Sequence, residues 1–274
     1  MIIGISNILD RLGVFFADKI GNALEYFIGL WELFSSTANS IFRDRTKGGS
    51  SLLKIIVNQT YFTGVQAMSL VSIMALMIGV IVTIQSFTLL ASVGFENLFG
   101  DIMVLGVIRE LGPLITTFIV ICRTGSGLAT YIGNMKVDEE IDALEVMGVN
   151  PVRYLIMPAF LGCMISIFCL TLIFDGIAVL GGFVVSQIFG VDISIGTFME
   201  QIYNALSPID FIVIIFKCMI FGSIIAIVSC YHALKVGISV TEVPQKTINA
   251  IVHSIVFSTI FNLLMSTFLY VFFK

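Results

Sequence analysis

The uncharged stretch from Ile55 to Phe95 is the feature that most constrains what this chain can fold into. A helix that crosses a bilayer needs about 20 mostly apolar residues, so this stretch is long enough to span a membrane. Composition agrees, because 58% of the residues are hydrophobic and only 12% are charged, whereas soluble domains carry about 25% charged residues. We therefore exclude a soluble globular protein and predict an all-α integral membrane protein.

Apolar segments recur along the chain often enough to predict five transmembrane helices. Charged residues interrupt the second, third and fourth segments, so their limits are harder to define than those of the first and fifth. The predicted spans cover residues 65–91, 102–133, 154–189, 211–232 and 247–273. An odd number of spans places the two ends of this region on opposite sides of the membrane.

Basic residues in the connecting segments predict the orientation, because cytoplasmic loops of membrane proteins are enriched in Lys and Arg. They precede the first span and lie between spans two and three and between spans four and five: Arg43, Arg45, Lys47, Lys54, Lys136, Arg153, Lys235 and Lys246. In the two other loops, all charged residues are acidic. We predict a multi-pass protein whose N-terminal region is cytoplasmic and whose C-terminus at Lys274 is on the outer side.

The first 50 residues differ from the rest of the chain. Over residues 1–34, apolar side chains recur at helical spacing while charged side chains occupy much of the remainder, a pattern typical of helices that lie along the membrane surface. A polar, Gly-containing segment from Arg43 to Ser51 follows. We therefore divide the chain into interfacial amphipathic helices with a polar hinge (1–50) and a transmembrane domain (51–274).

Nothing in the sequence predicts an enzyme. The phosphate-binding pattern G-x-x-x-x-G-K-[ST] is absent, and no nucleophile and base stand out. The two His residues, and five Cys residues without paired spacing, indicate neither a metal site nor a disulfide framework. A net charge of −4 offers no basic surface for nucleic acid. Hydrolysis of ATP, if it drives this protein, is expected on another chain, and no cofactor is expected here.

The segment between the second and third spans predicts an acidic amphipathic helix of about four turns, from Asn134 to Gly148. Its apolar residues form one stripe, and five acidic residues surround that stripe. One interpretation is a surface helix that rests on the membrane, although an anionic leaflet suits an acidic helix poorly. The other is a docking helix for a cytoplasmic partner. The stripe consists of Val137, Ile141, Leu144 and Met147.

Five charged residues fall inside the predicted spans, where charge is expensive and marks a functional site by default. Arg109, Glu110 and Arg123 belong to the second span, and Pro113 is expected to kink the helix between the two arginines. Asp175 and Lys217 fall in the outer halves of spans three and four, and we predict that they form an ion pair. The alternative for all five is structural pairing that holds the helices in register.

Several motifs together are similar to those of the MlaE (YrbE) family of ABC transporter permeases, which work with MCE-domain proteins in lipid transport. They are Arg109-Glu-Leu-Gly-Pro113, Arg123-x-Gly125, the string from Met135 to Gly148, and Asn150-Pro151. The resemblance covers about residues 50–272. The chain departs from the family at Cys122, where Gly is common, and at Pro158-Ala159, where Pro-Arg is common.

The resemblance implies a homodimer in the bacterial inner membrane, with two ATPase subunits carrying ATP and Mg below it and a periplasmic ring of MCE-domain proteins above it. The segment from Asn134 to Gly148 would be the coupling helix. Its contact residues would be Met135, Val137, Glu140, Ile141, Leu144, Glu145 and Met147.

A phospholipid would bind near the dimer axis, where Arg109 meets its phosphate. Glu110 would hold Arg109 in place or meet a headgroup amine. The apolar wall would consist of Leu111, Leu114, Ile115 and Phe118.

Two functions from other classes remain as alternatives at this point. One is an ion-coupled secondary transporter that uses Glu110 and Asp175 as titrating groups. The other is a membrane scaffold subunit whose buried charges only pair with one another.

Overall fold

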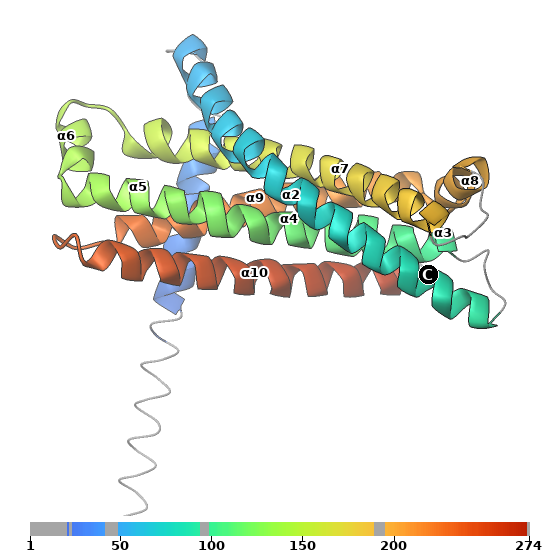
Figure 1. Ribbon diagram of the computed structural model, residues 1–274. Coiled ribbons are helices and arrows are strands. Elements are labelled where there is room, and N and C mark those ends of the chain that lie inside the picture. The colour runs from blue at the N-terminus through green and yellow to red at the C-terminus, as the bar shows by residue number, and fades with distance from the viewer. Residues whose placement is uncertain (1–20, 22–23, 42–48, 94–98, 189–194, 273–274) are drawn as a thin grey trace, which may run out of the picture.

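The computed structural model describes residues 21, 24–41, 49–93, 99–188 and 195–272, and all regular structure in that part of the chain is helical (Figure 1). Five helices are long and apolar enough to cross a membrane, which confirms the predicted fold class and number of spans. The predicted helices within residues 1–20 and most of the polar hinge lie outside the described residues. The five spans are Leu53–Leu90, Phe99–Val137, Val152–Ile188, Pro208–Leu234 and Glu242–Val271.

The first span lies within helix α2 (Gly49–Val93), which runs obliquely across the bundle and packs mainly on α7 (Met157–Ile188) (Figure 1). Small residues allow this close approach. A Cβ atom on Gly79 would collide with the backbone of Ala178, and Ala67, Val71 and Ala75 are completely buried on one face of α2. As in other membrane bundles, small side chains bring the two backbones together.

The second span is a composite helix in which α-helical and π-helical segments alternate. In order, it comprises α3 (Phe99–Ile102), η2 (Met103–Leu111), α4 (Gly112–Val120), η3 (Ile121–Gly125) and α5 (Ser126–Val137), with η2 and η3 π-helical. The N–H of Gly112 bonds to the carbonyl of Val107, five residues earlier. Pro113, which has no N–H to donate, is the second residue of α4 and follows the π-turn directly, and the helix continues past it.

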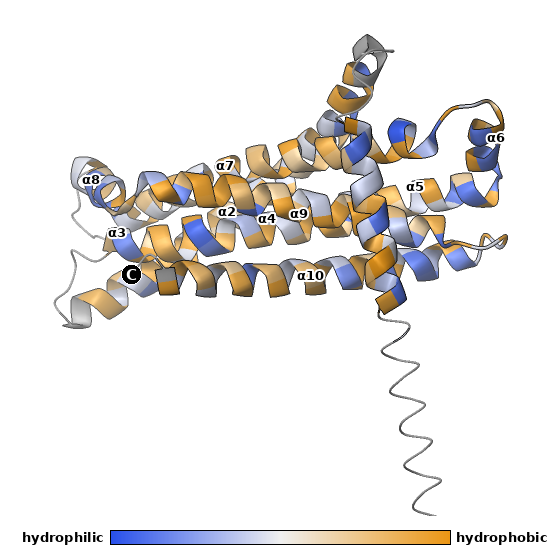
Figure 2. Ribbon diagram, turned by 180° about the vertical axis from the view of Figure 1, so that it is seen from behind, coloured by the Kyte–Doolittle hydropathy of each residue, from blue (hydrophilic) through white to orange (hydrophobic). Residues whose placement is uncertain are grey.

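The last two spans are α9 (Pro208–Leu234) and α10 (Glu242–Phe272). α9 is buried over much of its length between α7, α5 and α10, whereas much of α10 remains exposed. Figure 2 shows hydrophobic residues concentrated along the long helices and hydrophilic residues gathered at α6. An unlabelled helix over residues 24–41 crosses the bundle, and the Tyr26 hydroxyl lies 3.2 Å from Nε2 of His232 in α9.

One end of the bundle carries helix α8 (Ile195–Ala205), which was not predicted from the sequence. Phe198 on its inner face joins an aromatic cluster with Phe87, Phe99 and Phe183, with ring centroids 4.4–5.4 Å apart along the cluster. Burial of these rings attaches α8 to the first three spans, and we call this the α8 end.

The opposite end carries α6 (Glu140–Val146), and we call it the α6 end. The predicted single helix from Asn134 to Gly148 is wrong, because the chain turns at Asp138–Glu139 and Glu139 adopts a left-handed conformation with φ +59°. Residues 134–137 complete α5 instead. A connection then leads to the π-helical turn η4 (Val152–Ile156) at the start of the third span.

We expect Gly79→Ala to destabilise the protein by about 1–3 kcal/mol, because the added methyl group forces α2 away from α7. Thermal unfolding of the purified protein in detergent measures the effect. Gly176→Ala is the matched control, since a Cβ there meets no atom within 4 Å. Equal melting temperatures for the two variants would contradict the close α2–α7 packing.

Candidate functional site

Four charged side chains from the second and fourth spans meet inside the bundle. Arg109 and Glu110 come from η2, and Asp210 and Lys217 come from α9. Asn262 of α10 completes the group. We call these five residues the charged cluster.

Lys217 is the most buried member of the charged cluster, with 0% of its side chain exposed. Its Nζ donates to Oε1 of Glu110 at 2.9 Å and to the carbonyl oxygen of Arg109 at 3.0 Å. The second carboxylate oxygen of Glu110 accepts a hydrogen bond from Nδ2 of Asn262 at 2.9 Å. Glu110 is therefore held by α9 and α10 together.

The predicted ion pair between Asp175 and Lys217 is wrong, because Lys217 is bonded to Glu110. Asp175, on α7, is buried and packs beside Gly112, where a Cβ atom would collide with its Oδ1. That oxygen accepts no hydrogen bond from a described residue. The π-helical segment η2 brings Glu110 to α9. Lys217 therefore pairs with a carboxylate of the second span and not with one of the third.

Arg109 pairs with Asp210, which directly precedes the predicted fourth span (211–232) and is one of the acidic residues of the loop before it. Asp210 is 2% exposed, and its other oxygen accepts the backbone N–H of Ser207 at 3.0 Å, which caps α9. The pattern Ser207-Pro-Ile-Asp210 is a recognisable capping box, so it was the available signal for a fixed carboxylate at this point. The arginine side chain remains 25% exposed, and its Nε makes no hydrogen bond to a described residue.

The expectation that Glu110 holds Arg109 in place is thus corrected, since Asp210 is the partner of Arg109. The expected apolar wall lies along the same helix, from η2 into α4. All four of its side chains are half-buried, and two of them pack against the hydrophobic core. They are Leu111, Leu114, Ile115 and Phe118, of which the last two touch the core.

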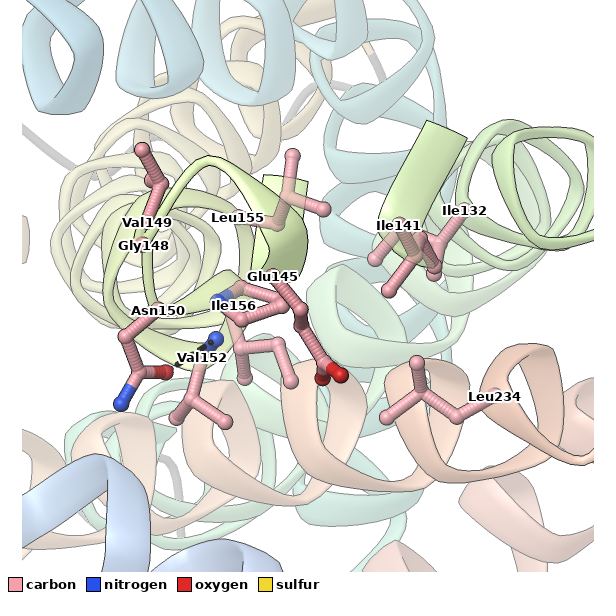
Figure 3. Close-up of a pocket in the computed structure, with 11 residues that line it drawn as sticks. Ile132, Ile141, Glu145, Gly148, Val149, Asn150, Val152, Leu155, Ile156 and Leu234 are labelled. Atoms are coloured by element: carbon pink, nitrogen blue, oxygen red, sulfur yellow. Dashed lines mark hydrogen bonds between the residues drawn. The ribbon is translucent and has the colours of Figure 1, made fainter. Parts of the chain in front are cut away.

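At the α6 end, the expected partner-facing stripe turns inward. Ile141 is buried and Leu144 packs against the core. Ile141 also lines a cavity of about 430 Å³ into which the Glu145 side chain projects (Figure 3). Met135 and Val137 sit in α5, where Met135 is buried and Val137 is half-buried.

The apolar side chains that α6 leaves exposed are Val146 and Met147, at 90% and 68%. Met147 belongs to the predicted stripe, whereas Val146 does not. Glu140 and Glu145 are exposed, and Lys136 pairs with Asp142 at 2.7 Å. The exposed face of this segment is therefore acidic with an apolar tip.

Comparison with known proteins gives consistent results. A family model described as Permease MlaE matches residues 56–268. A probable ABC transporter permease of Rickettsia prowazekii is 31% identical over 97% of this chain and 98% of its own length. The intermembrane phospholipid transport system permease protein MlaE of Haemophilus influenzae is 28% identical over 73% of this chain and 77% of its own. The chloroplast protein TRIGALACTOSYLDIACYLGLYCEROL 1 of Arabidopsis thaliana is 29% identical over 76% of this chain and 59% of its own.

We expect Lys217→Met to destabilise the bundle by about 3 kcal/mol, because it leaves the Glu110 carboxylate without its cation. The double variant Glu110→Gln/Lys217→Met recovers part of that loss, since no member of the pair then stays charged. A double-mutant cycle followed by thermal unfolding measures the coupling. Asp175→Asn combined with Lys217→Met is the matched cycle, and stronger coupling there than with Glu110 would refute the observed pairing.

Proposed function

Because this chain belongs to the MlaE permease family, we propose that it is the permease subunit of an ATP-driven ABC transporter that moves phospholipids. The lipid would pass between the inner membrane and a periplasmic ring of MCE-domain proteins. The relative from H. influenzae, named as an intermembrane phospholipid transport permease, supports this substrate class. The observation that carries the proposal is an arginine inside the membrane, fixed by a buried carboxylate yet still partly exposed.

The charged cluster suits the phosphate of a phospholipid. Two cations and two carboxylates balance one another, so the cluster is stable when empty. Arg109 retains donors beyond those that Asp210 occupies, because 25% of its side chain is exposed, and a guanidinium offers a fork of donors that matches phosphate. Leu111 and Leu114 continue the same helix and provide apolar surface for the acyl chains.

The assembly would be a homodimer, because α10 leaves much of its apolar surface without a partner within the described chain. Asn262 on this helix contacts Glu110, so α10 lies next to the charged cluster. A second copy packed there would enclose a cavity beside Arg109. The exposed apolar residues of α10 include Ile248, Val252, Val256, Ile260, Leu263 and Leu264.

The α6 end would face the cytoplasm and receive the ATPase subunit, which would supply ATP and Mg, while Lys274 would lie on the periplasmic side. This orientation follows from the basic residues at that end, namely Lys136, Arg153, Lys235 and Lys246. The acidic surface of α6 offers partners for Lys or Arg of the ATPase, and Val146 and Met147 offer an apolar anchor.

The ion-coupled alternative is less well supported. It requires Glu110 to release and bind protons, but both oxygens of that carboxylate are engaged by Lys217 and Asn262.

We expect Val146→Asp/Met147→Asp to reduce co-purification of the ATPase about tenfold, because the apolar anchor of the contact is lost. Stimulation of ATP hydrolysis by the permease falls in parallel. Tyr203→Asp, which alters a 78% exposed residue on α8 at the other end, is the control and retains the ATPase. Normal ATPase binding by the double variant would show that α6 is not the coupling element.

We expect Arg109→Ala to lower ATP-dependent lipid transfer about tenfold in proteoliposomes that contain the whole complex, because the lipid phosphate loses its charge-assisted contacts. Photocrosslinkers placed at Leu111 and Leu114 should capture phospholipid. The control Lys54→Ala removes an exposed cation outside the charged cluster. Crosslinks to protein only, together with full transfer by Arg109→Ala, would move the substrate site elsewhere.

A further inference from the structure

Arg123, the second arginine of the second span, has no acidic partner among the described residues. It lies in the π-helical segment η3, and its Nη2 donates to Oε1 of Gln66 in α2 at 2.9 Å. None of the ion pairs between described residues includes it. Arg109 with its partner Asp210 is 14 residues away, about 21 Å along a helix, so the charged cluster does not neutralise Arg123.

The guanidinium of Arg123 lies within a membrane span, where it needs an anion as counter-charge. Arginine stays charged in proteins and carries five N–H donors, of which the neutral amide of Gln66 accepts one. Charged side chains inside the membrane normally pair with a counter-charge or face a polar cavity. No described residue supplies a carboxylate to Arg123, so its anion comes from outside the described residues.

A pocket of about 530 Å³ lies beside this arginine, between α2, α5 and the start of α7. Gln66, which accepts the hydrogen bond from Arg123, and Thr124, the next residue in the chain, both line this pocket. The Thr124 hydroxyl is buried and makes no hydrogen bond to a described residue. Three exposed tyrosines, Tyr61, Tyr131 and Tyr154, line it as well. Tyrosine is enriched at the level of lipid headgroups, and Tyr131 lies eight residues, or about 12 Å, from Arg123 toward the α6 end.

We propose that this pocket binds the phosphate of a glycerophospholipid drawn from the leaflet on the α6 side, with Arg123 as its counter-ion. A free phosphate ion has no apolar part to bury, whereas Phe62 and Leu128 give the pocket walls that suit acyl chains. The inference rests on the proposed lipid transport, because it gives the same class of substrate a second site. The lipid phosphate would lie closer to the centre of the bilayer than the tyrosines, and therefore deeper than the headgroups of the surrounding leaflet.

Photolabelling of the complete transporter in nanodiscs tests this site. The probe is phosphatidylglycerol with a photoactivatable group near its phosphate, and peptide mass spectrometry maps the labelled residues. We expect labelling around Gln66 and Tyr131 in the unaltered protein, and a decrease of about tenfold in Arg123→Gln, because the counter-charge is lost. Arg123→Lys keeps the charge and retains much of the labelling. Labelling that is unchanged in Arg123→Gln would overturn the proposal.

Further arms of the same experiment identify the bound group. A diacylglycerol probe without phosphate should label the pocket weakly, and millimolar inorganic phosphate should not displace phosphatidylglycerol. Equal labelling by diacylglycerol, or displacement by inorganic phosphate, would each refute a lipid phosphate on Arg123. An Arg123 crosslink to a carboxylate of a second copy, in place of lipid, would also refute it.

Two variants separate this inference from the proposed function. Arg109→Ala should lower lipid transfer about tenfold while the pocket beside Arg123 is still labelled. If Arg123→Gln fails to fold, Gln66→Leu removes the neighbouring amide without changing any charge and should lower labelling of the same peptides. Loss of transfer in Arg109→Ala with no labelling of the pocket in any variant would refute the second site alone.

Discussion

The buried ammonium group of Lys217 is the constraint on which the arrangement of the spans depends. A lysine with no exposed side-chain surface needs a counter-charge within reach, and Glu110 provides it. Glu110 in turn binds Asn262, so one cation connects the second, fourth and fifth spans. Asp210, two helical turns before Lys217 on α9, holds Arg109 in the same way. Two consecutive residues of the second span are thereby attached to one helix.

The sequence was sufficient to predict the all-α fold and the five spans, because long apolar segments have few alternatives in a membrane protein. Residue spacing was not sufficient to predict the partner of Lys217. Asp175 was chosen by its depth along an ideal helix, but the π-helical segment η2 changes the direction in which Glu110 points. Asp210 was overlooked because it was assigned to a loop, although its place in the capping box at the start of α9 fixes its carboxylate.

The acidic segment near α6 shows a related limit of what residue spacing can predict. Hydrophobic periodicity identifies an apolar stripe, but it does not say whether the stripe faces the protein or a partner. The left-handed residue Glu139 ends α5 early and reorients the following turns, so Ile141 packs inward while Val146 stays exposed. Helix α8 was not predicted, although Ile195, Phe198, Met199 and Ile202 recur at the spacing typical of an amphipathic helix.

The π-helical segments of the second span also determine how this helix tolerates changes in length. A π-turn holds one residue more than the α-helical turn it replaces. Deletion of a single residue within η2 could therefore restore a regular α-helix without breaking the chain. The flanking segments would keep their mutual orientation, because the extra residue is absorbed within the turn, but the residues inside η2 would take new directions around the helix axis. Arg109 and Glu110 could no longer both reach α9, so the length of this helix is set by the alignment of its charges as much as by the thickness of the membrane.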